Sequence, residues 1–272
     1  MATRIDRNLP QSIVYHIDNN GIATVTLCRP EKANAFNADV IAQLNSALDS
    51  LPADPTVKAL ILNSQGKHFS AGADIEWMRS MVTKSEQENH LDAYQLATLL
   101  DKLDRFPFPT VAIVQGCAFG GALGLICCCD MVFASENCQL CLSEVKLGLI
   151  PATIAPYVIR AMGVRHARRY MLSAERIDAH TALELNLVHR ISPSLDLNED
   201  AHQWLLPILN HGPQAMVEVK RLCHHCAESP IDDALMRYTS ELIAKIRVSP
   251  QGQEGLSAFL QKRAPDWMKK EH

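Results

Sequence analysis

The alternation of hydrophobic and polar residues predicts a chain in which strands and helices follow one another. Two β-rich runs, Ser12–Asp18 and Ile22–Cys28, flank Asn19-Asn20-Gly21, and an Asn-Gly pair between such runs is typical of a hairpin. Apolar residues then recur at helical spacing over Asn37–Leu51, which opens with a common helix-capping residue. The apolar run Val57–Asn63 is typical of a buried parallel strand. A strand, a helix and a strand in this order predict a right-handed crossover in an α/β fold.

The rest of the pattern divides the chain into a mixed part and a helical part. A long helix is predicted over Glu86–Phe106 and a strand over Thr110–Gln115. A buried helix of small apolar residues follows over Ala122–Cys129, and a further strand over Gln139–Leu142. Beyond Pro156 the periodicity is mainly helical. We therefore expect a layered α/β part first and a helical tail after it.

Composition and charge narrow the class of protein. The 272 residues are 47% hydrophobic and carry a formal net charge of −4, which argues against nucleic acid as the main partner. No apolar run approaches the roughly 20 residues of a membrane-spanning helix. The N-terminal segment MATRIDRNLPQ has no apolar stretch behind its basic residues, so we expect no secretory signal. Nine cysteines, an odd count, then predict reduced thiols and a cytoplasmic location.

One short cluster has metal-ligand chemistry. Cys223-His224-His225-Cys226 places two thiols three residues apart on a predicted helix. A tetrahedral site needs further ligands, and the sequence holds no second cluster to supply them. We therefore expect no bound metal, and no nicotinamide or flavin cofactor.

The chemistry of the chain points to two glycine-containing turns and one acid. The small-residue run Gly116–Gly124 follows an apolar strand and leads into the predicted helix. A strand that turns through glycines into a helix leaves the first helical N–H groups unpaired, which suits an oxyanion. A second such turn surrounds Gly72, so the two turns together can supply two donors to one oxygen. Glu144 stands among leucines and valine, where a carboxylate pKa tends to rise. The alternative is a tight helix-packing turn with an exposed glutamate.

The chain resembles the crotonase, or enoyl-CoA hydratase/isomerase, superfamily over nearly its whole length. The matching motifs occur in the family's order. They are Ala23–Pro30 with Asn34-Ala35-Phe36, HFSAGADI (His68–Ile75), VQGCAFGGALGL (Val114–Leu125), LSEVKLGLIPA (Leu142–Ala152) and FLQKRAPDW (Phe259–Trp267).

The resemblance implies a fold and an assembly. The fold is a spiral of ββα units over residues 1–195, which carries the active site. Residues 196–272 would form a helical region that serves oligomerisation and completes the CoA site. The assembly would be a homotrimer or a dimer of trimers. No cofactor is implied beyond the coenzyme A of the substrate.

The resemblance also implies the site residues. The thioester carbonyl oxygen of an acyl-CoA would lie between the backbone N–H groups of Ala73 and Gly121, which stabilise an enolate. Glu144 matches a catalytic acid of the family. The implied contacts with CoA and substrate fall on Lys32, Ala33, Ala71, Asp74, Ile75, Gly120 and Lys262.

One departure from the family leaves the reaction open. Two-glutamate hydratases carry a second glutamate in the glycine-rich helix, where this chain has Gly124. A single carboxylate can run hydration, because it can take a proton from water and return it to the α-carbon. The 3-enoyl to 2-enoyl isomerases of the family also use one carboxylate. A non-catalytic CoA-binding or RNA-binding member of the fold is a third alternative, which the retained Glu144 argues against.

The segment Ser143–Val188 resembles bacterial methylglutaconyl-CoA hydratases of leucine and isovalerate breakdown, and isohexenylglutaconyl-CoA hydratases of acyclic terpene breakdown. Their substrates carry a distal carboxylate, for which Lys146 and Arg79 are candidate partners, although surface positions are typical of such residues. Asp130 follows the cysteine-rich helix, and we expect it to hydrogen-bond backbone there rather than to serve as a second acid.

Overall fold

The computed structural model describes residues 11–268 and divides the chain after His202 into two compact units. The prediction about a secretory signal falls on residues 1–10, which lie outside the described residues. The sequence places the corresponding boundary at residue 195, and the roles that it gives to the two regions stay predictions.

The first unit is built on two sheets. The strands are β1 (Ile13–Ile17), β2 (Ile22–Leu27), β3 (Ala59–Ser64), β4 (Thr110–Val114), β5 (Cys117–Phe119), β6 (Met131–Ser135), β7 (Gln139–Cys141), β8 (Ile177–Asp178) and β9 (Arg190–Ser192). The larger sheet has the order β1-β2-β3-β4-β6-β9, and only its β1–β2 pair is antiparallel. The smaller sheet has the order β5-β7-β8, with β5 and β7 parallel.

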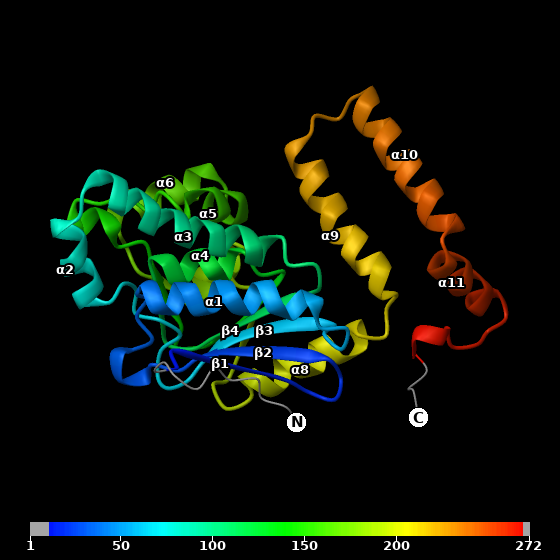
Figure 1. The fold of residues 1–272 in the computed structure, drawn as a ribbon, viewed down its shortest axis with the longest axis horizontal. Coiled ribbons are helices and arrows are strands. Elements are labelled where there is room, and N and C mark those ends of the chain that lie inside the picture. Colours follow the sequence, from blue (N-terminus) through cyan, green and yellow to red (C-terminus); the bar gives the residue numbers. More distant parts are fainter. Residues whose placement is uncertain (1–10, 269–272) are drawn as a thin grey trace. The chain divides into compact units, whose positions relative to one another are not determined.

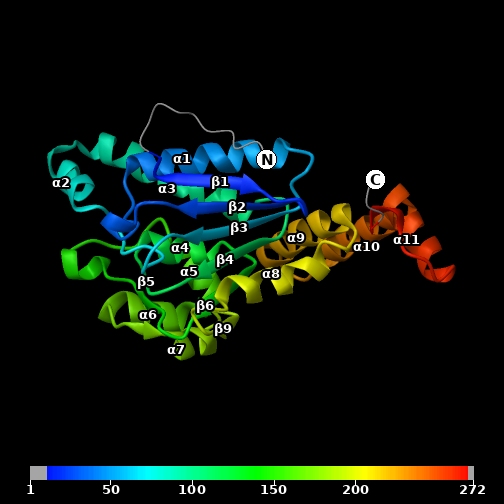
Figure 2. The ribbon, with the colours of Figure 1, turned by 90° about the horizontal axis from the view of Figure 1, so that it is seen from below.

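Helices surround these sheets and continue into the second unit. They are α1 (Ala38–Ser50), α2 (Ile75–Thr83), α3 (Glu86–Asp104), α4 (Gly121–Cys127), α5 (Ala155–Met162), α6 (Val164–Ser173), α7 (Ala179–Glu184), α8 (Leu197–Ile208), α9 (Pro213–Glu228), α10 (Asp233–Val248) and α11 (Pro250–Leu260). In the first unit, α1 and α3 lie side by side over the larger sheet (Figure 1). Figure 2 shows β1 to β4 of that sheet in a row.

The local signals of the sequence explain the first elements. The predicted hairpin is confirmed, because β1 and β2 pair with Ile17 opposite Ala23. Its turn is closed by Asp18, whose Oδ1 accepts the N–H groups of Asn20 (2.8 Å) and Ile22 (2.9 Å). The N-cap Asn37 is also confirmed, since its Oδ1 accepts the N–H of Val40 at 2.9 Å. β3 then lies parallel to β2, as a strand-helix-strand order predicts.

The route through the glycine-rich run differs from the prediction. The chain does not pass directly from β4 into α4, because β5 stands between them and belongs to the smaller sheet. Gly116 redirects the chain there with φ +59°, and a β-carbon on it would lie 2.2 Å from the oxygen of Lys67. A strand of three residues carries too little alternation to be read from the sequence. The sequence pattern does not indicate β6 either.

The second unit is helical and has a small interior. α10 packs against α11, and α11 contacts α9. The indole Nε1 of Trp267 donates to the oxygen of Asn210 (3.1 Å), and Arg263 forms a two-pronged ion pair with Glu254 (2.6 and 2.8 Å). α9 has no buried residue, and many apolar side chains of this unit are exposed. Within the described residues, no helix is long and apolar enough to cross a membrane.

Candidate active site

The first predicted oxyanion donor lies on a loop that two backbone bridges hold in place. Phe36 donates its N–H to Gly72 O (2.7 Å) and accepts the N–H of Asp74 (2.8 Å), so Phe36 and Ala73 form a parallel bridge. In such a bridge the N–H of Ala73 itself points away from Phe36. Gly72 takes φ +105°, which only glycine adopts without strain. The backbone therefore presents the Ala73 N–H on the free side of the bridge.

The second predicted donor lies where β5 turns into α4. Gly120 donates its N–H to Cys141 O (3.0 Å), which fixes the end of β5 against β7. It then turns the chain with φ +55° and ψ −124°, so that Gly121 becomes the first residue of α4. The N–H of a first helical residue has no partner within its helix. No acceptor for the Gly121 N–H occurs among residues 11–268, and its role as a donor to a substrate oxygen stays a prediction.

The two turns are neighbours. Ser70 donates to Cys117 O (3.0 Å) and accepts from Phe119 N–H (3.1 Å), which joins the Gly72 loop to β5. A β-carbon on Gly72 would lie 3.7 Å from the Phe119 oxygen, and one on Gly121 would lie 3.4 Å from Phe36 Cδ2. The structure thus brings the segments of both predicted donors together, while their joint binding of one thioester oxygen stays a prediction.

Glu144 lies beside the second turn. It follows β7 and opens the 3₁₀ helix Glu144–Leu147. Its Oε1 lies 3.2 Å from the position that a β-carbon on Gly120 would take. Its Oε2 is buried and has no hydrogen-bond partner among the described residues. A glycine at position 120 thus leaves room for the carboxylate to approach the turn.

The environment of Glu144 tunes it for proton transfer. Burial raises the pKa of the carboxyl above its usual value, and a hydrogen bond from its own backbone N–H opposes this only in part. The predicted direction of the shift is confirmed. A raised pKa brings the carboxyl closer to neutral pH, where a group can both take and return a proton.

The predicted CoA contacts in the first unit lie on two adjoining turns. Ala71 donates its N–H to Ala33 O at 2.9 Å, so these two residues are neighbours. Lys32 and Ile75 are exposed, and Ile75 opens α2 with 64% of its surface accessible. Lys262 is exposed and belongs to the second unit. The part of each in CoA binding stays a prediction.

The carboxylate of Asp74 is occupied within the chain. It caps α2 by accepting the N–H of Glu76 (2.9 Å), and it accepts a hydrogen bond from Arg29 (3.0 Å). Burial opposes its ionisation, but these bonds and the charge of Arg29 outweigh burial and lower the pKa of Asp74. Its backbone is bonded within the chain as well, because its N–H donates to Phe36 O (2.8 Å) and its oxygen accepts the N–H of Met78 (2.9 Å). A role for Asp74 in binding CoA or substrate stays a prediction.

Asn34 is a positioning residue whose role the sequence did not reveal. Its side chain is buried and donates to the oxygens of Gln65 and His68, both at 2.8 Å. It also accepts the N–H of Arg29 at 2.9 Å. These bonds tie the turn that holds Ala33 to the loop that holds Ala73. Asn34 adopts φ +52°, a left-handed conformation that asparagine tolerates better than most residues. The residue type is therefore the hint that the sequence gives for this position.

Asp130 is not a second acid of the site. Its Oδ2 accepts both the N–H (2.8 Å) and the hydroxyl (2.9 Å) of Thr110 at the start of β4. The prediction that it hydrogen-bonds backbone is confirmed.

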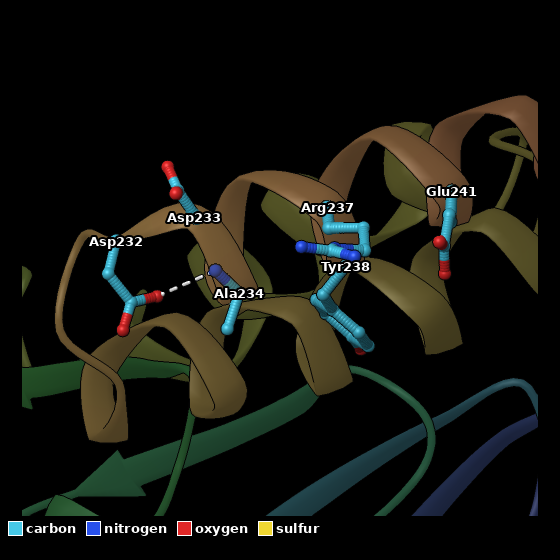
Figure 3. Close-up of a pocket in the computed structure, with 6 residues that line it drawn as sticks. All are labelled: Asp232, Asp233, Ala234, Arg237, Tyr238 and Glu241. Carbon is cyan, nitrogen blue, oxygen red and sulfur yellow. Dashed lines mark hydrogen bonds between the residues drawn. The ribbon is translucent and has the colours of Figure 1, made fainter.

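The cavities of the second unit hold none of the predicted acid–base residues. One of about 800 Å³ is lined by Asp232, Asp233, Ala234, Arg237, Tyr238 and Glu241. Figure 3 shows these side chains along α10, where Asp232 accepts the N–H of Ala234 (3.0 Å). Cys223 and Cys226 of α9 are exposed, and no group of three metal-ligating side chains occurs within residues 11–268.

Comparisons with known proteins agree with this geometry. The family model for enoyl-CoA hydratase/isomerase matches residues 18–270. A crystal structure of an enoyl-CoA hydratase from Shewanella pealeana superimposes with a TM-score of 0.92 at 47% identity, covering 94% of this chain and 96% of that one.

Two curated relatives show the range of reactions. The 2,3-dehydroadipyl-CoA hydratase of Escherichia coli is 30% identical, over 90% of this chain and 94% of its own. The mitochondrial Δ(3,5)-Δ(2,4)-dienoyl-CoA isomerase of Dictyostelium discoideum is 27% identical, over 91% and 88%.

These matches confirm the expected fold, an α/β crotonase fold with a C-terminal helical region. They also make the chain an enzyme that acts on acyl-CoA substrates. The protein therefore belongs to the enoyl-CoA hydratase/isomerase family of the crotonase superfamily.

Proposed function

We propose that the enzyme is a hydratase that adds water across the 2,3 double bond of a branched or carboxylated 2-enoyl-CoA, of which 3-methylglutaconyl-CoA is the model. The observation that carries this proposal is the buried, unpartnered Oε2 of Glu144 next to the Gly120–Gly121 turn. An orphaned carboxylate oxygen in such a place calls for a partner, and a water molecule or a substrate C–H supplies one. Such substrates would place the enzyme in leucine or isovalerate breakdown, or in acyclic terpene breakdown.

One carboxylate completes the reaction. Glu144 takes a proton from water as the water oxygen bonds to C3 of the substrate. The electrons of the double bond move to the thioester oxygen, and the N–H groups of Ala73 and Gly121 stabilise the enolate. Glu144 then returns its proton to C2, so that one water molecule has been added and the enzyme is unchanged.

The alternative reaction is migration of the double bond. Glu144 would remove a proton from C2 of a 3-enoyl-CoA and return it to C4, without adding water. Gly124 favours this alternative, because the second acid of two-glutamate hydratases is missing. The relationship to a dienoyl-CoA isomerase also supports it.

A substrate panel in deuterated water separates the two reactions. The purified enzyme receives 3-methylglutaconyl-CoA, crotonyl-CoA and 3-hexenoyl-CoA, and the products are followed by mass. Hydration requires addition of one D₂O to the first substrate, well above the others. Double-bond migration in the third, with no water added to any substrate, would replace the hydratase by the isomerase.

The distal carboxylate of the proposed substrate needs a cationic partner. Arg176 is a candidate for this role that the sequence does not single out. β7 and β8 pair antiparallel with Leu140 opposite Ile177. Continued by one residue, this register aligns Arg176 with Cys141, and Cys141 precedes Glu144 by three residues. The guanidinium carbon lies 5.9 Å from the Phe119 ring centroid, and Phe119 directly precedes Gly120. Arg176 is exposed and forms no ion pair with a carboxylate of the described residues. We propose that Arg176 binds the distal carboxylate.

Lys146 is the second cation of this neighbourhood. Burial raises the pKa of the Cys141 thiol most, while Lys146 and Arg176 lower it and Glu144 raises it further. The charges of Glu144, Lys146 and Arg176 therefore all shift the pKa of the same buried thiol, which shows that the three side chains lie near it. Lys146 joins Arg176 as a candidate partner, whereas the structure adds nothing for the exposed Arg79.

We expect Arg176→Met to raise KM for 3-methylglutaconyl-CoA about tenfold and to leave kcat/KM for crotonyl-CoA within about twofold. A charge-assisted hydrogen bond contributes roughly 1.5–3 kcal/mol, and crotonyl-CoA has no distal carboxylate to lose it. Steady-state kinetics with both substrates measures the split. Arg165→Met, which removes an exposed arginine from α6, is the matched control. An equal loss with both substrates would assign Arg176 to CoA or to the fold.

The second unit supports a proposed homotrimer or dimer of trimers. α11 leaves Phe259 and Leu260 exposed by 81% and 78%, and α10 leaves Val248 exposed by 74%. Apolar surfaces of this kind mark interfaces. Sedimentation equilibrium gives the mass, and a monomer at micromolar concentration would contradict the proposal.

We also propose that the enzyme has no resident cofactor. Elemental analysis and an absorption spectrum of the purified protein test this proposal. The cytoplasmic location stays a prediction.

A further inference from the structure

The departure at Gly124 is matched by a side chain from a distant segment. Gly124 is buried in α4, one turn beyond the predicted donor Gly121. A β-carbon on Gly124 would lie 2.3 Å from Ile154 Cγ2, 2.9 Å from Ile154 Cβ and 3.2 Å from Leu100 Cδ2. Carbon atoms do not approach within 3 Å without displacement. No side chain at position 124, and no carboxylate, therefore fits while Ile154 stays where it is.

Ile154 cannot easily turn aside. Its Cβ is fixed to the backbone, and a β-branched side chain has few rotamers to choose from. It is the N-cap of α5, its oxygen accepts the N–H groups of Tyr157 and Val158 (both 3.1 Å), and its side chain is buried. Relief of the contact would require the backbone at the start of α5 to move.

An ion pair holds α5 against α3. Arg160 donates to both carboxylate oxygens of Asp104, one of them at 3.1 Å, and Asp104 is buried at the end of α3. The guanidinium also lies over the Tyr157 ring, 5.5 Å from its centroid. α4 contacts both α3 and α5. Leu100 and Ile154 are thus fixed on the two helices that enclose Gly124.

The acid and the obstructing side chain belong to one segment. This segment begins at Glu144 and ends at Ile154. Within it, the backbone oxygen of Glu144 accepts the N–H of Leu149 (3.1 Å). Two residues therefore fit each other. Gly124 stands where two-glutamate hydratases carry their second acid, and the Ile154 side chain fills the space that the side chain of that acid would need. A single substitution cannot restore the second acid.

We propose that Ile154 is the specificity-determining residue that confines this enzyme to single-carboxylate chemistry. It fills the volume beside Gly124, so Glu144 alone exchanges protons with substrate and water. This inference rests on the proposed role of Glu144 and adds the reason why no second acid assists it.

A cycle of variants tests the packing without reference to turnover. We expect Gly124→Ala to lower the Tm of the otherwise native chain by roughly 5 °C, because the methyl group meets Ile154. In the background of Ile154→Gly, which removes Cγ2 and Cβ but suits an N-cap, the same substitution should raise Tm by partly refilling the cavity. Ile154→Ala, which keeps Cβ, serves as a milder background and should show a smaller relief. Equal Tm losses in all backgrounds would overturn the assignment of Ile154.

A second measurement tests the chemistry. We expect Gly124→Glu combined with Ile154→Gly to hydrate crotonyl-CoA at least tenfold faster than Ile154→Gly alone, because a carboxylate now fits at position 124. No gain over Ile154→Gly would overturn the inference. Failure of the proposed function would appear separately, as turnover that survives Glu144→Gln, whereas the reversal in Tm does not depend on turnover.

Discussion

Glu144→Gln is expected to lower kcat by about a thousandfold, within the range that one general acid–base group contributes. The amide keeps the size of the side chain but cannot take a proton from water or return one to carbon. Because the thioester contacts expected of Ala73 and Gly121 are backbone groups, the Kd of a non-reactive acyl-CoA should stay within about threefold. Steady-state kinetics and calorimetric titration measure the two quantities.

The matched control is Glu136→Gln, which removes an exposed carboxylate from the turn between β6 and β7. We expect no more than a twofold change in kcat for this variant. Turnover of Glu144→Gln within tenfold of the native enzyme would mean that the proton carrier is another residue.

The raised pKa of Glu144 gives the same substitution a signature in stability. Because burial makes ionisation harder in the folded state, the folded chain binds more protons than the unfolded chain between the two pKa values. Stability from this group is present below the unfolded pKa, near 4.5, and is lost as pH rises through the folded value. Glu144→Gln should therefore raise Tm at pH 7 relative to the native enzyme, and this difference should shrink towards pH 4. In the native enzyme kcat/KM should fall as pH drops through the raised pKa, since the first step needs the carboxylate.

Local chemistry made the first elements and much of the site predictable. The Asn-Gly turn and the Asn37 cap depend on neighbouring residues alone, so a single sequence contains all that fixes them. The glycines at 72 and 120 have positive φ values, and because such values favour glycine, the residue type itself marks both turns in the sequence. The position of Glu144 within leucines likewise indicated the direction of its pKa shift.

Features set by register and by distant packing were not predictable. Arg176 reaches Phe119 only because β8 pairs with β7 in one particular register, and a two-residue strand carries no periodic signal. Ile154 looks like any core isoleucine in the sequence, and only packing places its Cγ2 beside Gly124. The departure at position 124 was visible, but its cause lies thirty residues away in the chain.

Gly120→Ala is expected to have the second large effect, because the added β-carbon causes both backbone strain and a close contact with Glu144. The values φ +55° and ψ −124° lie in a region that residues with a β-carbon rarely adopt, at a cost of about 1–3 kcal/mol. The new β-carbon would also lie 3.2 Å from Oε1 of Glu144 and push the carboxylate from the turn. A displacement of about 1 Å at a reacting group can lower the rate about a hundredfold, whereas relief of this contact requires the carboxylate to shift by a few tenths of an ångström. We therefore expect a loss in kcat of about tenfold, together with a lower Tm.

Gly163→Ala separates these two costs. Gly163 also has a positive φ, +77°, but a β-carbon there would have no atom within 4 Å. This control should lower Tm and leave kcat within about twofold, because it introduces strain without a contact at Glu144. If Gly120→Ala lost stability while its kcat stayed close to that of Gly163→Ala, the carboxylate would not depend on the space that Gly120 leaves. Proton transfer would then have to occur from a position of Glu144 other than the one beside the Gly120–Gly121 turn.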